Sequence, residues 1–181
     1  ADGTPRGEEF QVNVFTTGFQ ENPSVAMSDD GHFVAAWQSD GQDGDFYGVY
    51  ARRFFPDCTP AGGEFQVNET TVDAQRAPQV AMDDTADFTV EWEGRTEKMA
   101  DAVYGRRYEA DGTPQGGEWR ISVGTSPVAR APDVALDAES ARHHGLDNAQ
   151  SILKDFAHGL EAAESLRGLP LREYETQGRR I

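Results

Sequence analysis

Apolar and polar residues alternate over short stretches of the chain, and one such stretch occurs twice. The segment Phe33-Val34-Ala35-Ala36-Trp37 returns 55 residues later as Phe88-Thr89-Val90-Glu91-Trp92. In the second copy every other residue is apolar, which is the period of a β-strand with one face turned to the core. The pattern therefore predicts a strand in each copy, with Phe33, Ala35 and Trp37 pointing inward.

These strands belong to a longer block that repeats in tandem. Pro23 and Pro78 keep the same spacing of 55 residues. The hexapeptide Gly-Glu-Phe-Gln-Val-Asn at 63–68 matches segment 8–13 closely and returns in altered form at 117–122. Agreement at several separate places indicates a true repeat of about 54 residues, with two full copies and the start of a third.

Each copy is expected to contribute four short strands. The first runs through segment 8–13 and the second through Val25, after which Asp30-Gly31 offers a tight hairpin turn into the Phe33 strand. The fourth runs through segment 50–54. It contains two adjacent arginines, Arg52 and Arg53, which must point to opposite faces and which we expect to neutralise nearby carboxylates rather than bind a ligand.

Four antiparallel strands in about 50 residues is the size of one blade of a β-propeller, and kelch-type blades have about this period. The sequence therefore predicts an all-β fold of blade-like, four-stranded repeats, with a two-sheet β-sandwich as the alternative. A propeller needs roughly four or more blades. Because Ala1 already lies inside a repeat and no initiator Met precedes it, we expect either a segment of a longer array or a protomer that completes its ring with other chains.

The chain changes character after residue 138. Apolar residues then recur at the three- and four-residue spacing of an amphipathic helix, which Gly168 and Pro170 end. The sequence thus predicts a β-repeat domain over 1–140 and a helical segment with a tail over 141–181. We expect the helix to seal an open sheet edge or, like the open edges themselves, to mediate homo-oligomerisation. The stripe consists of Ile152, Phe156, Leu160, Ala163 and Leu166.

Charge narrows the range of partners. The net charge is −16, and segment 141–181 contains equal numbers of acidic and basic residues, so the repeats carry all of it. Nucleic acid is an unfavourable partner, since phosphate binding requires a basic surface. No apolar run reaches the length of a membrane span, so membrane insertion is not expected. The single cysteine, Cys58, occupies a turn position that Gly3 and Gly112 hold in the other copies.

Several motifs point to one kind of protein. The hexapeptide above, Trp-Gln-Ser at 37–39, Gly-Gln-Asp-Gly at 41–44, Tyr-Gly-Val-Tyr-Ala-Arg-Arg at 47–53 and Ala-Asp-Gly-Thr-Pro at 1–5 resemble tandem repeats of very large secreted or cell-surface bacterial proteins. Those repeats often lie beside hemolysin-type calcium-binding repeats. The resemblance covers residues 1–138. It implies an extracellular or cell-surface location and dependence on calcium, with no established enzymatic activity.

The loop after the Trp37 strand is the sharpest candidate site. Asp40, Asp43 and Asp45 bring three carboxylates onto a Gly-rich turn, and Ca²⁺ binds 6–8 oxygen ligands from such loops. The spacing does not match an EF-hand, and Gly- and Asp-rich turns also occur for conformational reasons alone. The hypothesis is a calcium site made by these three residues.

Two function classes remain open. The first is a noncatalytic module for adhesion, binding a glycan or protein ligand through loops at one end of the blades. The second is a carbohydrate-active hydrolase with a propeller-like fold, which would need unrepeated carboxylates in a pocket. The sequence contains no phosphate-binding glycine loop and no nucleophile elbow. His143 and His144 are adjacent, so they cannot share a helix face as metal ligands do. We therefore predict a noncatalytic protein.

Overall fold

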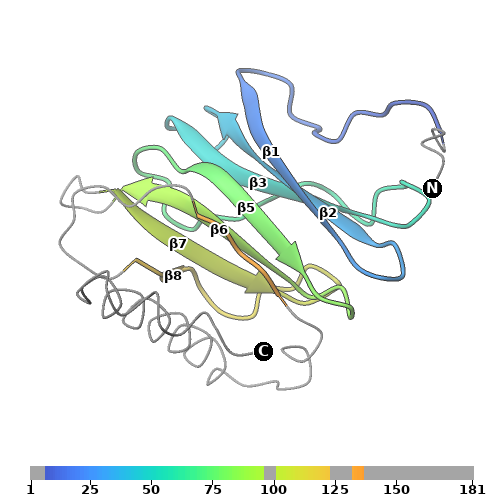
Figure 1. Cartoon of the computed structure of the whole chain (residues 1–181). Coiled ribbons are helices and arrows are strands. Elements are labelled where there is room, and N and C mark those ends of the chain that lie inside the picture. The colour runs from blue at the N-terminus through green and yellow to red at the C-terminus, as the bar shows by residue number, and fades with distance from the viewer. Residues whose placement is uncertain (1–6, 96–100, 123–131, 137–181) are drawn as a thin grey trace, which may run out of the picture. The chain divides into compact units, whose positions relative to one another are not determined.

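The computed structural model describes residues 7–95, 101–122 and 132–136. They lie in the first of two compact units, Ala1–Ala141, and form eight strands and no helix (Figure 1). One antiparallel sheet contains β1 (Gln20–Met27), β2 (Phe33–Asp40), β3 (Tyr47–Phe54) and β4 (Phe65–Gln66). The other contains β5 (Arg76–Met82), β6 (Phe88–Arg95), β7 (Asp101–Tyr108) and β8 (Trp119–Arg120). The predicted all-β class with four-stranded antiparallel sheets is confirmed. The helix and tail predicted over 141–181 lie outside the described residues.

Each sheet is a meander, with its strands in chain order. The predicted hairpin turn between β1 and β2 is confirmed. Ser28 N–H donates to the His32 carbonyl at 2.9 Å, and Gly31 takes a φ of 92°. The β5–β6 turn repeats the geometry, since Asp83 N–H donates to the Asp87 carbonyl at 2.9 Å. The two copies therefore share a fold down to their turns.

The phase of the repeat differs from the prediction. Segment 63–68 does not begin the second sheet; its residues Phe65–Gln66 form β4, which pairs with β3 and completes the first sheet. Likewise β8 completes the second sheet. Segment 8–13, predicted as the first strand, is not a strand. The prediction was wrong because alternation identifies a strand but not the neighbour with which it pairs.

The two sheets share one hydrophobic core. β5 lies beside β1 and β2 (Figure 1), and aromatic residues of the second sheet meet small residues of the first. The second sheet covers the face of β2 that bears Val34 and Ala36, and not the predicted face with Phe33, Ala35 and Trp37. Trp37, on the other face, is nevertheless nearly as inaccessible. The predicted outward position of Thr89 is also buried. The core cluster comprises Val34, Ala36, Val49, Ala51, Val67, Val80, Phe88, Val90, Trp92 and Tyr108.

A repeated set of polar contacts holds each hexapeptide segment against the sheet that follows it. Arg52 Nη1 donates to the Val12 carbonyl at 2.9 Å, and its counterpart Arg106 donates to the Val67 carbonyl at 3.1 Å. The carboxylate of Glu64 accepts the backbone N–H groups of residues 14 and 15, as Glu118 does for residues 69 and 70. These charge-assisted bonds recur with the repeat period. Segment 8–15 thus lies on the first sheet as segment 63–70 lies on the second.

The turn that contains Cys58 has a backbone conformation that suits glycine better. Cys58 is exposed and has a φ of 67°, while its counterpart Gly112 has a φ of 86°. A left-handed conformation is costly for a residue with a Cβ atom and free for glycine. We expect Cys58→Gly to raise the free energy of unfolding by about 0.5–1 kcal/mol, measured by urea denaturation. Cys58→Ser retains the Cβ atom and serves as the control; an equal gain from it would contradict the explanation.

Candidate functional site

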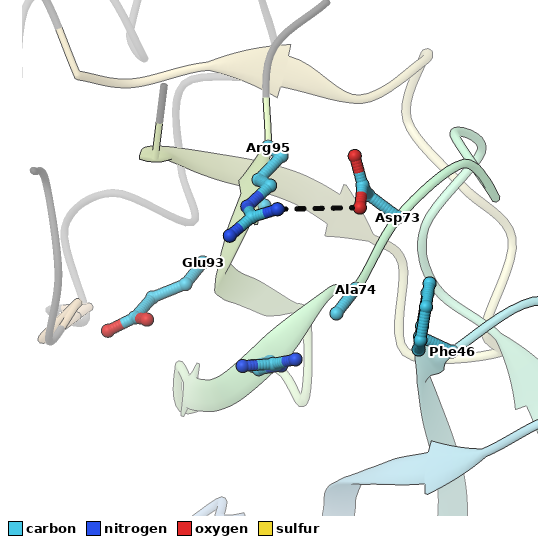
Figure 2. Close-up of a pocket in the computed structure, with 7 residues that line it drawn as sticks. Phe46, Asp73, Ala74, Glu93 and Arg95 are labelled. Atoms are coloured by element: carbon cyan, nitrogen blue, oxygen red, sulfur yellow. Dashed lines mark ion pairs between the residues drawn. The ribbon is translucent and has the colours of Figure 1, made fainter. Parts of the chain in front are cut away.

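A polar pocket of about 330 Å³ opens at the ends of β5 and β6, beside the turn that leads into β3 (Figure 2). The lining residues come from the turn before β3, the loop that leads into β5, and the last three residues of β6. Two backbone hydrogen bonds fix that loop: Asp73 N–H donates to Asp45 Oδ2 at 2.9 Å, and Gln75 N–H donates to the Tyr47 carbonyl at 2.7 Å. The pocket is lined by Phe46, Asp73, Ala74, Arg76, Glu93, Gly94 and Arg95.

Charges of both signs line this pocket. Arg95 Nη1 lies 3.6 Å from Asp73 Oδ1, and Figure 2 shows the two side chains pointing toward one another. Arg76 stands directly opposite Glu93 in the β5–β6 ladder. The Arg76 guanidinium also lies over the ring of Tyr47, at 5.5 Å from its centroid. The walls therefore offer hydrogen-bond donors and acceptors side by side.

Phe46 adds an apolar surface to the polar walls. Its side chain is 59% exposed, and Figure 2 places it on the side of the pocket away from Glu93.

Burial, and then the hydrogen bond from the neighbouring Tyr47 hydroxyl to Glu21, raise the pKa of Tyr47. Tyr47 therefore stays a neutral phenol beneath Arg76.

The pocket residues are not repeated in the first copy. The positions of Arg76 and Glu93 correspond to Glu21 and Gln38 one repeat earlier. The backbone is shared at these places, so fold alone does not explain the change of side chain. None of these pocket residues was among the predicted site residues. Comparing the two copies for positions where polar residues differ would have pointed to it.

Two of the three predicted calcium ligands, Asp43 and Asp45, contact different partners. Asp43 Oδ2 accepts from Asn68 Nδ2 at 3.4 Å, in the space that Gly48 leaves open by lacking a Cβ atom. Asp45 Oδ2 holds the pocket loop through Asp73, as described above. Asp40 ends β2. In the part of the chain that the structure describes, no group of three or more His, Cys, Asp or Glu side chains is placed to hold a metal ion. Calcium binding by this loop stays a prediction.

The adjacent arginines of β7 pair with carboxylates, whereas Arg52 and Arg53 of β3, for which that role was predicted, donate to backbone carbonyls among the described residues. Arg106 pairs with Glu69 at 2.7 Å, and Arg107 lies 3.8 Å from the carboxylates of both Asp83 and Asp87. In the first copy, Arg53 donates instead to the Ala110 carbonyl at 2.7 Å. The guanidinium groups of these arginines are thus bonded to other segments of the fold, which is a structural role.

A second group with unusual electrostatics lies on β6. Burial, together with the nearby charge of Asp133, raises the pKa of Glu91 to about 7. Segment 132–136, orange in Figure 1, runs beside β6, much as β5 runs beside β2. In the first copy the position of Glu91 is held by Ala36. Glu91 is thus a carboxyl group placed where the fold otherwise puts a small apolar residue.

This raised pKa predicts a pH dependence of stability. Between the ordinary pKa of 4.5 and the raised pKa of about 7, the folded chain binds more protons at Glu91 than the unfolded chain does. The contribution of Glu91 to the free energy of unfolding therefore falls as pH rises through this window. Glu91→Gln should therefore gain stability relative to the natural chain as pH rises, reaching about 1–2 kcal/mol above pH 7 after allowance for solvent screening. Urea denaturation of both proteins between pH 5 and pH 8 measures the difference; a constant difference would contradict the prediction.

The described residues include no helix long and apolar enough to cross a membrane. Neither a protein-family model nor a curated protein sequence matches this chain.

Proposed function

We propose that the protein is a noncatalytic, extracellular repeat module for adhesion, which binds a glycan in the pocket beside Phe46. The observation that supports the proposal is the combination of an exposed aromatic ring with fixed arginine and carboxylate groups around one cavity. The C–H face of a sugar ring packs well on an aromatic side chain. Its hydroxyl groups can accept from Arg76 and donate to Glu93, which stand opposite one another.

We further propose that the two sheets are consecutive blades of a propeller-like array. The support is that the same strand of the next copy lies beside each sheet: β5 lies beside β2, and its counterpart, segment 132–136, lies beside β6. In such an array loops from neighbouring blades meet at one end, and the pocket combines the ends of β5 and β6 with Phe46 from the turn before β3. Surface location and calcium stabilisation belong to the same proposal and rest on the resemblance; calorimetric titration with Ca²⁺ tests the latter.

Glycan binding can be tested with variants at the pocket. We expect Phe46→Ala and Arg76→Ala each to weaken binding of a glycan, first identified on a glycan array, by at least about tenfold, since truncating a central contact commonly has this effect. Isothermal titration calorimetry measures the affinity. Matched controls are Phe55→Ala, a 46% exposed ring at the other end of β3, and Arg120→Ala, an exposed arginine on β8. Unchanged affinity in both pocket variants would reject the site.

The hydrolase remains a second candidate because of Glu91. A carboxyl group with a pKa near 7 beside a second carboxylate has the properties of a general acid paired with a nucleophile or base. Hydrolysis of a glycoside in a panel, abolished by Glu91→Gln, would favour this candidate over the binding module. Binding without turnover in the same panel would favour the module.

A further inference from the structure

The first sheet leaves uncovered two apolar side chains whose counterparts in the second sheet pack in or against the core. Val25 and Met27 of β1 are 65% and 62% exposed. One repeat later, Val80 is 8% exposed, and Met82 packs with it against the core shared with the first sheet. The face of the first sheet that bears Val25 and Met27 is therefore exposed, whereas the equivalent face of the second sheet packs against the first sheet.

On the same face lies segment 8–13, which corresponds to the segment that forms β4 but is not paired with a strand. In the first sheet Val67 N–H donates to the Val49 carbonyl at 2.8 Å, next to the ladder between β4 and β3. Segment 8–13 is placed like segment 63–68: the rings of Phe10 and Phe54 are 5.6 Å apart, against 5.4 Å for Phe65 and Tyr108. Among the described residues, however, no backbone hydrogen bond joins segment 8–13 to a strand. Segment 8–13 therefore lies where a fourth strand would lie, and its backbone groups are open to pairing with a further strand.

We propose that these two features form one docking surface, and that its occupant is a further β-meander of the same repeat. We call the surface, made by Phe10, Val12, Val25 and Met27, the N-terminal face. The occupant pairs its third strand with segment 8–13. It covers Val25 and Met27 with small side chains at the positions that Val34, Ala36, Val49 and Ala51 hold in the first sheet. Strand addition of this kind combines backbone pairing with side-chain packing.

An intact second copy of the chain does not fit this surface. In the described residues both candidate edges are filled, since β3 already pairs with β4 and β7 with β8. The small-residue face of the first sheet is covered by the second. A net charge of −16 on each copy also opposes self-association. The partner is therefore a three-stranded repeat that lacks its own fourth strand.

The experiment supplies such a repeat to the full chain. A duplicate of residues 8–62 is fused before residue 8, which preserves the natural spacing because residue 63 corresponds to residue 8. The amide of Val12 in the original copy, the counterpart of Val67, is followed by hydrogen exchange. We expect its exchange to slow by at least about tenfold in the fused chain relative to the unfused chain, as it would for a newly paired strand.

Met27→Glu shows whether the same face is involved. In the unfused chain Met27 is largely exposed, so the substitution should leave the melting temperature unchanged; in the fused chain it should abolish the protection of Val12. Val72→Glu, at a 70% exposed site away from this face, should do neither. Fast exchange of Val12 in the fused chain would overturn the proposal. So would self-association of the unfused chain that Met27→Glu removes, because the occupant would then be a second copy.

This inference rests on the proposed blade-like array and not on the ligand of the pocket. Glycan affinity, measured on the same fused chain, separates the two. If Val12 stays unprotected while the Phe46- and Arg76-dependent binding persists, the docking proposal fails and the binding site stands. If Val12 is protected and no glycan binds, the reverse holds.

Discussion

Replacement of Trp92 by alanine is expected to lower the free energy of unfolding by about 3–5 kcal/mol, a large share of the stability of an ordinary domain. The indole is 1% exposed and belongs to the core that joins the two sheets. It stacks on Tyr104 with 6.3 Å between the ring centroids. Removing it loses the transfer free energy of a large ring and leaves a cavity where β6 meets the small residues of the first sheet.

Urea denaturation measures this loss. Val72→Ala, at a 70% exposed position, is the control and should change stability by no more than about 0.5 kcal/mol. Because Trp92 contacts the core of both sheets, tryptophan fluorescence and far-ultraviolet circular dichroism should report one shared transition in the natural chain. A loss below about 1 kcal/mol for Trp92→Ala would contradict the placement of this ring in a close-packed core.

Replacement of Arg107 by methionine is expected to cost about 3–5 kcal/mol at pH 7, since it breaks a buried ion pair by removing one partner. The guanidinium lies 3.8 Å from the carboxylates of both Asp83 and Asp87, whose side chains are 0% and 10% exposed. Asp83 Oδ1 is already occupied by three donors, the N–H and hydroxyl of Thr85 and the N–H of Asp87. Without Arg107, two buried negative charges would face one another.

Two further variants separate this cause from simple loss of packing. Asp87→Asn in the Arg107→Met background removes one of the two charges and should recover part of the loss, while its Oδ1 can still accept from Ala110 N–H. Arg95→Met breaks an ion pair with Asp73 in which the side chains are 48% and 28% exposed, and should cost less than about 1 kcal/mol. Equal losses for Arg107→Met and Arg95→Met would rule out the burial argument.

The strands and their hairpins could be predicted from the sequence because the repeat supplies an internal comparison. Thr89 and Glu91 show which positions of the Phe33 strand tolerate polar residues, and hence where the strand lies. The same comparison identified the Cys58 turn through its glycine counterparts. Alternation and turn residues are local properties, so they can be recognised in the sequence without knowledge of the tertiary fold.

Pairing and packing between copies could not be predicted in the same way. Segment 63–68 alternates as a strand should, yet nothing local decides whether it pairs with β3 or begins the next sheet. The pocket joins Phe46 to Arg95, which are nearly a whole repeat apart in the sequence, and its residues are those that the two copies do not share. Asp40, Asp43 and Asp45 are close in sequence, but the turn directs Asp43 and Asp45 to different neighbours. Closeness in sequence therefore does not by itself decide which side chains share a partner.

The displaced fourth strand has a consequence for how such proteins change length. Each sheet takes its last strand from the following copy, and the contacts between copies return at the repeat spacing. Deleting or duplicating one full period then leaves every sheet with four strands, wherever the breakpoint falls. Unequal recombination within the gene can add or remove whole units without producing a half-built one, and natural selection can adjust the reach of the protein in single steps.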